Sequence, residues 1–386
     1  MKYMFLCLAV CLSLMTSAQK TGLNIIAYYS GDEKAIDGYP VEKLSHIIYS
    51  FCHLKGNRLN VDDAKDSATI KKLVSLKQKN PKLRVMLSLG GWGGCKSCSD
   101  VFSENAARLE FAASVKELND YFGTDGIDLD WEYPCYSEAD IKSLPDDKCN
   151  FTLLLKAIRD ALDVKGTPGH PGHPWKVEDK PNFTALVKAL RDALGSKHEI
   201  SFAAGGFRRF LEEAVEWKLL EPLIDRVNLM SYDLVSGFST TTGHHTPLYS
   251  NANQEASADH AITWLDSIGF PMNKVVIGAA FYARTWEGVE NINNGLYQSG
   301  TFKSFVARRN FVQQFTEAKG YVFYRDPVSQ APYAYSSKEK IFATYDDEIS
   351  IRAKTKYARD KKLDGIMFWE LTLDPKEKGL LEEMGR

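Results

Sequence analysis

Short apolar segments rich in β-branched and aromatic residues recur along the chain, and each has the length of a strand. Eight such segments are present, at residues 24–30, 46–54, 84–91, 126–133, 199–207, 226–233, 274–282 and 365–371. Helical patterns separate them. In residues 105–122, for example, Phe111, Val115, Leu118 and Phe122 fall on one helical face. Strands that alternate with amphipathic helices indicate parallel β/α units.

The number of these units predicts the fold class. Eight β/α units close a (β/α)8 barrel, so we expect an α/β protein with a TIM barrel, and an open doubly wound sheet is the alternative. The stretch between the seventh and eighth strands, residues 286–345, is too long for one helix and is rich in Tyr, Phe, Asn and Gly. It predicts a small α+β insertion on the C-terminal face of the barrel, where it would form one wall of a cleft.

A second long connection follows the fourth strand and contains an internal repeat. Residues 147–162 (DKCNFTLLLKAIRDAL) and 179–194 (DKPNFTALVKALRDAL) are identical at 12 of 16 positions. Two copies are too few for a solenoid, which needs about three. Because the second copy directly precedes the fifth strand, we expect it to be a barrel helix. Residues 135–181 are then an insertion with a duplicated helix beside the cleft.

The N-terminus resembles an export signal. Lys2 is followed by an apolar run at residues 3–15 and by the small residues Thr16-Ser17-Ala18, as in a signal peptide. The run is too short to span a bilayer, which takes about 20 residues. We therefore expect residues 1–19 to be removed and residues 20–386 to be secreted, or periplasmic in a Gram-negative bacterium, with no membrane span in the mature chain.

Removal of the signal leaves an odd number of cysteines. Cys95-x-x-Cys98 is compatible with a zinc half-site, a redox pair or a loop disulfide. The export signal favours a local disulfide or free thiols. Cys135 and Cys149 are candidates for a second pair, and Cys52, inside an apolar strand, is the best candidate for a free thiol.

Composition excludes several classes of protein. Lys and Arg total 48 against 50 for Asp and Glu, so there is no broad basic surface for nucleic acid. Hydrophobic residues make up 44% and charged residues 25%, which excludes a disordered or fibrous chain. Aromatic residues make up 12%, which suits a ring-binding cleft, although core packing accounts for most of it.

The fourth strand carries a row of acidic residues, in the sequence DGIDLDWEYP at 125–134. Side chains alternate along a strand, so Asp128, Asp130 and Glu132 share one face, and the apolar residues between them share the other. If the apolar face packs on helices, the three carboxyls point into the barrel. Buried like charges cannot all ionise, so Asp128 and Asp130 should share a proton, and Glu132, nearest the mouth, suits a general acid.

No other segment offers comparable chemistry. The chain has no Ser-His-Asp elbow, no HExxH and no helix-opening GxGxxG. The pair His244-His245 is interpreted as polar side chains of a loop, and His170 and His173 as part of a Pro-Gly surface turn. No metal or organic cofactor is implied.

The acidic strand resembles the signature of glycoside hydrolase family 18, the chitinase family. Similar motifs occur at the ends of four other predicted strands, at residues 88–92, 230–233, 281–284 and 367–370, although Ala283 stands where Gly is usual. Residues 286–345 resemble the chitinase insertion domain. The resemblance implies an enzyme that cleaves β-1,4-linked N-acetylglucosamine with retention, the acetamido oxygen of the substrate acting as the nucleophile. Separately from the resemblance, we expect a monomer.

The resemblance also implies roles for individual residues. Glu132 would protonate the leaving oxygen and then activate water, while Asp130 would orient the acetamido N–H. Asp128 would hold the proton that lets Asp130 change partners, and Tyr232 would donate to the acetamido oxygen. Trp369 would form the floor of the site and Trp92 would cover the leaving-group side. The remaining residues expected to line the site are Tyr28, Phe51, Met230, Asp233, Tyr282 and Arg284.

Two other functions remain open from the sequence. One is an endo-β-N-acetylglucosaminidase that cuts N-glycans, which also occurs on family 18 barrels. The other is a chitinase-like lectin that binds sugar without cutting it. Such lectins typically lack the acidic residue at the position of Glu132, which is present here.

Overall fold

The computed structural model of the protein describes residues 22–134 and 176–384. The predicted signal peptide, most of the predicted insertion at 135–181, and the residues Cys135, Cys149, His170 and His173 lie outside this range. Within it, no helix is long and apolar enough to cross a membrane.

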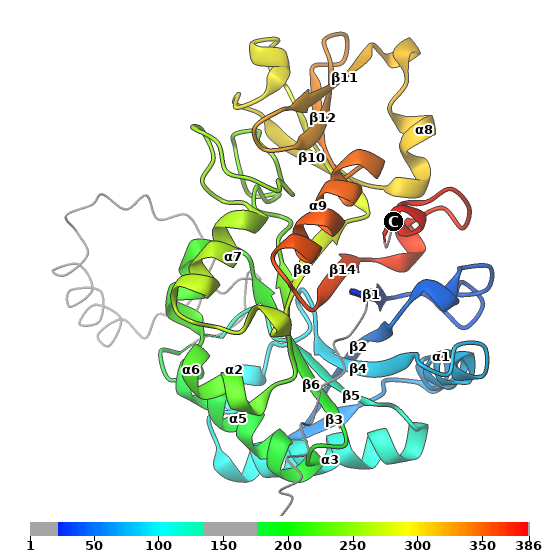
Figure 1. Ribbon diagram of the computed structural model, residues 1–386, viewed down its shortest axis with the longest axis vertical. Coiled ribbons are helices and arrows are strands. Elements are labelled where there is room, and N and C mark those ends of the chain that lie inside the picture. Colours follow the sequence, from blue (N-terminus) through cyan, green and yellow to red (C-terminus); the bar gives the residue numbers. More distant parts are fainter. Residues whose placement is uncertain (1–21, 135–175, 385–386) are drawn as a thin grey trace, which may run out of the picture.

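Eight parallel strands form a closed barrel (Figure 1). Their bounds are β1 (Asn24–Tyr29), β2 (His46–Lys55), β4 (Arg84–Gly90), β5 (Gly126–Asp130), β6 (Glu199–Gly205), β7 (Arg226–Met230), β8 (Val275–Ala280) and β14 (Gly365–Trp369). Strand β1 pairs with both β14 and β2, which closes the sheet. The prediction of a (β/α)8 barrel is confirmed, and the open sheet is excluded. A short strand, β3 (Arg58–Asn60), runs antiparallel to the end of β2.

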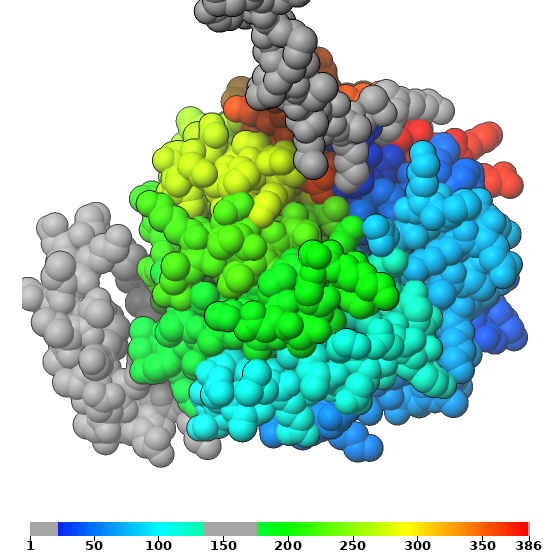
Figure 2. All heavy atoms as spheres, turned by 60° about the horizontal axis from the view of Figure 1, so that its bottom comes forward, coloured from blue at the N-terminus to red at the C-terminus, as the bar shows by residue number. Residues whose placement is uncertain are grey.

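Helices cover the outside of the barrel. They are α1 (Ala64–Ser75), α2 (Cys98–Val101), α3 (Asn105–Phe122), α5 (Asp179–Leu194), α6 (Trp217–Leu220), α7 (Ala258–Ser267) and α9 (Glu348–Asp360). The short α8 (Phe311–Gln314) lies within the predicted insertion at residues 286–345. The second copy of the sequence repeat is α5, which leads into β6 and lies beside α3 on the surface (Figure 2). Helix α3 ends at Gly123 in a left-handed conformation, and Asp347 caps the start of α9.

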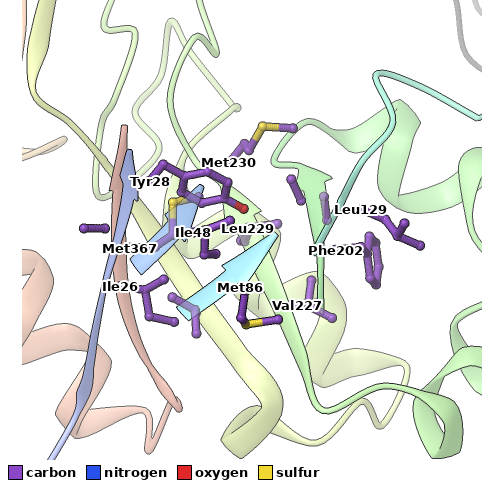
Figure 3. Packing of buried hydrophobic residues seen from close by; sticks show 14 of the residues in the cluster. Ile26, Tyr28, Ile48, Met86, Leu129, Phe202, Val227, Leu229, Met230 and Met367 are labelled. Atoms are coloured by element: carbon purple, nitrogen blue, oxygen red, sulfur yellow. The ribbon is translucent and has the colours of Figure 1, made fainter. Parts of the chain in front are cut away.

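Because side chains alternate along each strand, the core has two layers, one inside the barrel and one between the barrel and the helices. Ile26, Ile48, Met86 and Met367 fill the lower interior of the barrel, whereas side chains such as Leu129 and Phe202 lie together on the helix-facing side (Figure 3). This division places the carboxyls of β5 inside the barrel, because the neighbouring Leu129 is on its outer face.

A five-stranded antiparallel sheet follows β8, in the order β10-β9-β13-β12-β11. Its strands are β9 (Tyr282–Glu287), β10 (Thr301–Ala307), β11 (Tyr321–Asp326), β12 (Ala331–Ser336) and β13 (Ile341–Thr344). The sheet extends beyond one end of the barrel (Figure 1). It starts at Tyr282, ahead of the expected boundary at 286, because β9 begins within the segment expected to be the seventh barrel strand and only Phe281 separates it from β8.

The cysteines in the described range take two states. Cys95 and Cys98 form a disulfide in the connection after β4, and Cys52 is a buried free thiol.

Candidate active site

A cavity of about 400 Å³ opens at the carboxyl ends of the barrel strands, and the insertion sheet forms one of its walls. It brings together ten of the twelve predicted site residues, which are Phe51, Trp92, Asp130, Glu132, Met230, Tyr232, Asp233, Tyr282, Arg284 and Trp369. Asp128 and Tyr28 do not line it. Both are buried beneath its floor.

Asp128 is surrounded by hydrogen-bond donors. Its Oδ2 accepts from the hydroxyls of Tyr28 at 3.0 Å and Ser88 at 3.1 Å, and its Oδ1 accepts from Ser201 Oγ at 2.6 Å and Asn228 Nδ2 at 3.1 Å. The Asn228 amide also donates to the oxygens of Tyr28 and Ser201, so those hydroxyl protons point at Asp128. Burial raises the pKa of Asp128, and these four hydrogen bonds counteract part of that rise.

Asp130 lies one step higher on β5 and lacks such support. Its Oδ1 is buried and has no hydrogen-bond partner among the described residues. Burial, followed by the charges of Glu132 and Asp128, raises the pKa of Asp130 well above its ordinary value. Because Asp128 has donors that stabilise its anion and Asp130 does not, we place the proton of the pair on Asp130. This differs from the expectation that Asp128 would hold it.

Glu132 is at the rim of this row. It lines the cavity and is 9% exposed, while the preceding Trp131 packs on the opposite side against Phe102 and Phe183. Tyr232 follows β7 and lines the same cavity. Burial raises the pKa of the Tyr232 hydroxyl well above its usual value, so it remains a hydrogen-bond donor at neutral pH.

The cavity has aromatic surfaces on two sides. The half-buried Trp369 stacks on Phe51, with ring centroids 5.6 Å apart and an interplanar angle of 16°. Trp92 is 47% exposed and lies 6.1 Å from the ring of Phe238. Tyr28, which is among the residues predicted to line the site, does not line this cavity. Its ring is fully buried near Trp369, because its hydroxyl reaches down to Asp128.

An ion pair connects the barrel to the insertion sheet. Arg284 on β9 binds Asp233 through two nitrogens, with Nη2 2.6 Å from Oδ2 and Nε donating to Oδ1. Burial alone would raise the pKa of Asp233, but the hydrogen bonds from Arg284 and His245 hold it well below its usual range. Asp233 is therefore ionised and already paired.

Phe302 and Phe305 on β10 also line the cavity, although no sequence motif points to either residue. Residues three apart in a regular strand point to opposite faces. Here the register shifts between Phe302 and Ser304, so that Phe302 pairs with Trp286 and Phe305 with Arg284. This bulge turns both rings toward the cavity, and Phe305 stacks on Tyr282 at 4.7 Å.

His244 and His245 are not polar side chains of an exposed loop, because both are completely buried. His245 Nδ1 lies 3.3 Å from Asp233 Oδ1, and His244 Nε2 lies 3.2 Å from Asp326 Oδ2 on β11. Within residues 22–134 and 176–384, no group of three or more His, Cys, Asp or Glu side chains is placed to hold a metal ion.

The barrel, the row of carboxyls and the aromatic cavity define a protein of the glycoside hydrolase class. The family model described as "Glycosyl hydrolases family 18" matches residues 24–171 and 168–374, and the chain belongs to this family. The assignment made from the sequence motifs is therefore confirmed.

Relatives and solved structures agree with this assignment. Chitinase A1 of Niallia circulans is 32% identical over 331 residues, which cover 80% of this chain and 43% of that protein. Chitotriosidase-1 of Mus musculus is 28% identical over 348 residues, which cover 86% of this chain and 67% of that protein. A family 18 N-acetylglucosaminidase from Paenibacillus barengoltzii superimposes with a TM-score of 0.78 at 31% identity, covering 94% of this chain and 98% of that one.

Proposed function

We propose that the chain hydrolyses β-1,4-linked N-acetylglucosamine, in chitin or its oligomers, with retention and with the substrate's own acetamide as nucleophile. The observation that carries this proposal concerns the carboxyls that line the cavity in the described range. Asp130 is kept protonated by burial, and Asp233 is paired with Arg284, so neither is a free nucleophile. Glu132 is left for proton transfer, and in a retaining reaction the nucleophile then comes from the substrate, an established exception to the two-carboxylate rule.

The cavity suits each step of such a reaction. A pyranose ring stacks on the indole of Trp369, with its acetamido group near Asp130 and Tyr232. Glu132 protonates the leaving oxygen while the acetamido oxygen attacks the anomeric carbon, giving an oxazolinium ion. The unpartnered Oδ1 of Asp130 accepts the acetamido N–H, and the Tyr232 hydroxyl donates to the acetamido oxygen. Water then gives a proton to the Glu132 carboxylate and attacks the anomeric carbon, which breaks the bond to the acetamido oxygen and opens the oxazolinium ring. A nucleophile already attached to the substrate has a high effective concentration.

The test is hydrolysis of N-acetylglucosamine oligomers of two to six units by the wild type and by Glu132→Gln. We expect the substitution to lower the rate by about a hundredfold or more, the scale of a lost general acid. Glu110→Gln, at an exposed carboxyl on α3, is the control and should leave the rate unchanged. If the wild type binds the oligomers without cutting them, the proposal fails and the lectin function is favoured. Cleavage of N-glycans alone would favour the endoglycosidase.

Product size bears on the mode of cleavage. The Paenibacillus structure is of an N-acetylglucosaminidase, whereas the Niallia relative is a chitinase. Single sugars as first products would indicate action of the former kind, and longer fragments cleavage within the chain.

We also propose that the protein is exported and acts as a monomer. The N-terminal sequence of residues 1–19 supports export. The mass of the protein recovered outside the cell, and its size in solution, test these two points. A mass that includes residues 1–19, or a dimer, would contradict them.

A further inference from the structure

His245 lies directly behind the ion pair of the site. The side chain is completely buried, and its Nδ1 is 3.3 Å from Asp233 Oδ1. Its backbone is held on both sides, because its N–H donates to Thr344 Oγ1 and its carbonyl accepts from Leu234 N–H. Its ring packs 5.2 Å from the ring of Tyr282. The imidazole is therefore fixed at the junction of the barrel and the insertion sheet.

The contacts of its two ring nitrogens determine where the proton lies. Nε2 is buried and has no hydrogen-bond partner within the described residues, whereas Nδ1 faces a carboxylate. A proton on Nε2 would be buried without an acceptor, so the neutral ring carries its proton on Nδ1 and donates it to Asp233.

The charges around the ring agree with a neutral imidazole. Burial lowers the pKa of His245, as does the positive charge of Arg284, while Asp233 and Asp346 act in the opposite direction. The net effect is a lowered pKa.

Asp233 consequently has donors on two sides. Arg284 reaches it from β9, and His245 reaches it from the segment that precedes α7. Tyr282 also contacts both members of the ion pair, and the Arg284 guanidinium lies over its ring. The donor on His245 differs in that it belongs to a buried ring whose backbone is held on both sides, so it gives the carboxylate a fixed contact.

We infer that His245 is a positioning residue that holds the Asp233 carboxylate, and through it Arg284, in place at the sugar-binding cavity. The inference rests on the proposed function, since it assumes that these two residues meet a sugar. His245 itself does not line the cavity and acts only through Asp233.

The neighbouring residue provides a matched control. His244 is equally buried, but its Nε2 contacts Asp326 on β11, away from the cavity. Loss of either imidazole should cost folding stability, but only loss of His245 should change how the site binds its substrate.

The experiment compares His245→Leu, His245→Asn and His244→Leu. We expect His245→Leu to lower kcat/KM for chitooligosaccharides about ten- to a hundredfold, the range for a lost hydrogen bond to a charged group. His245→Asn, whose amide N–H can take the place of Nδ1–H, should recover most of that loss. His244→Leu should leave kcat/KM within about threefold of the wild type. Equal losses in His245→Leu and His244→Leu would overturn the inference.

A double substitution tests whether His245 acts through Asp233. In the background of Asp233→Asn, the added change His245→Leu should lower kcat/KM no further. Independent, multiplying losses would assign His245 a purely structural role.

A substrate-free measurement separates this inference from the proposed function. Ring ¹⁵N chemical shifts of the wild type should show His245 neutral, with its proton on Nδ1, at about pH 7 to 8. A proton on Nε2 would overturn the inference. If the wild type does not hydrolyse the oligomers, the proposed function fails, and the ¹⁵N spectrum still decides the contact between His245 and Asp233.

Discussion

The two aspartates of β5, Asp128 and Asp130, differ in their hydrogen bonding because their neighbours differ. Asp128 is fully buried but receives four hydrogen bonds, whereas Asp130 is buried with an unpartnered oxygen. An unsatisfied buried carboxyl lowers the stability of the fold, and a substrate that supplies the missing partner is one explanation for keeping it. We therefore infer that the burial of Asp130 lowers the stability of the fold and serves the proposed reaction.

This view predicts opposite effects on stability and activity for Asp130→Asn. The folded state holds the Asp130 proton more tightly than the unfolded state, so this group stabilises the fold below the ordinary aspartate pKa and loses that contribution as the pH rises. The amide is neutral at every pH. Its Tm should therefore exceed that of the wild type at pH 8 by about 2 °C or more, with a smaller difference at pH 4. Hydrolysis should fall about a hundredfold.

Thermal unfolding at the two pH values checks this prediction. Asp192→Asn, at an exposed position on α5, serves as the control and should show no pH-dependent difference. A lower Tm for Asp130→Asn at pH 8 would mean that the carboxyl is ionised and satisfied in the folded protein.

For single residues, the sequence predicted the face of the strand on which a side chain lies better than it predicted the hydrogen-bond partner of that side chain. The period of two along residues 126–133 was enough to place the carboxyls of β5 on the inner face. It could not show that Tyr28 would bind Asp128, or that His245 would bind Asp233, because these contacts join residues 100 and 12 positions apart in the chain.

The strands of the insertion sheet shape the cavity through one irregularity. The bulge in β10 places Phe302 and Phe305 on the same face as Arg284, and Phe305 remains 44% exposed. An exposed aromatic ring beside a sugar-binding cavity offers a further stacking surface.

We predict that Phe305→Ala affects long substrates more than short ones. Loss of one stacking ring should raise KM for the hexamer about three- to tenfold, corresponding to roughly 1 kcal/mol, and change KM for the dimer little. Phe323→Ala, on β11 outside the cavity and 54% exposed, is the matched control. Steady-state kinetics on oligomers of increasing length would show the difference, and an equal effect of both substitutions would count against this role of β10.

Element boundaries were predictable where polar residues or turns interrupt the apolar pattern. All eight barrel strands begin within one residue of their predicted start for this reason. The break between β8 and β9 was missed because the residues around Phe281 are apolar on both sides. The bulge in β10 was missed as well, since it depends on pairing with β9.

At the scale of the whole molecule, charged residues close the end of the barrel opposite the cavity. Arg226 on β7 contacts Glu199 on β6 at 3.0 Å and Asp364 before β14 at 2.6 Å, and His46 on β2 contacts Glu199 at 3.0 Å. These contacts join strands on different sides of the barrel. Burial raises the pKa of Glu199, but His46 and Arg226 outweigh it and hold that pKa well below its usual range.

Glu199→Gln should therefore destabilise the barrel at neutral pH. A carboxyl with a depressed pKa stabilises the fold above its unfolded pKa and loses that contribution as the pH falls. We expect a loss of about 2 kcal/mol at pH 7, less than for a completely buried pair because the side chain is 23% exposed, and a smaller loss near pH 3. Urea unfolding measures it. The surface pair of Arg58 with Glu117 gives the control, since Glu117→Gln should change stability by about 0.5 kcal/mol or less.

The claim that the substrate supplies the nucleophile is tested most directly by changing only the acetamide. Rates should be compared for an aryl glycoside of N,N′-diacetylchitobiose and for its trifluoroacetamido counterpart, whose carbonyl oxygen is far less nucleophilic. Because the cavity presents a protonated Asp130 and a paired Asp233, we predict that the second substrate reacts about a hundredfold more slowly or worse. Equal rates for the two substrates would show that an enzyme group or water attacks the sugar, and would contradict the mechanism proposed for this site.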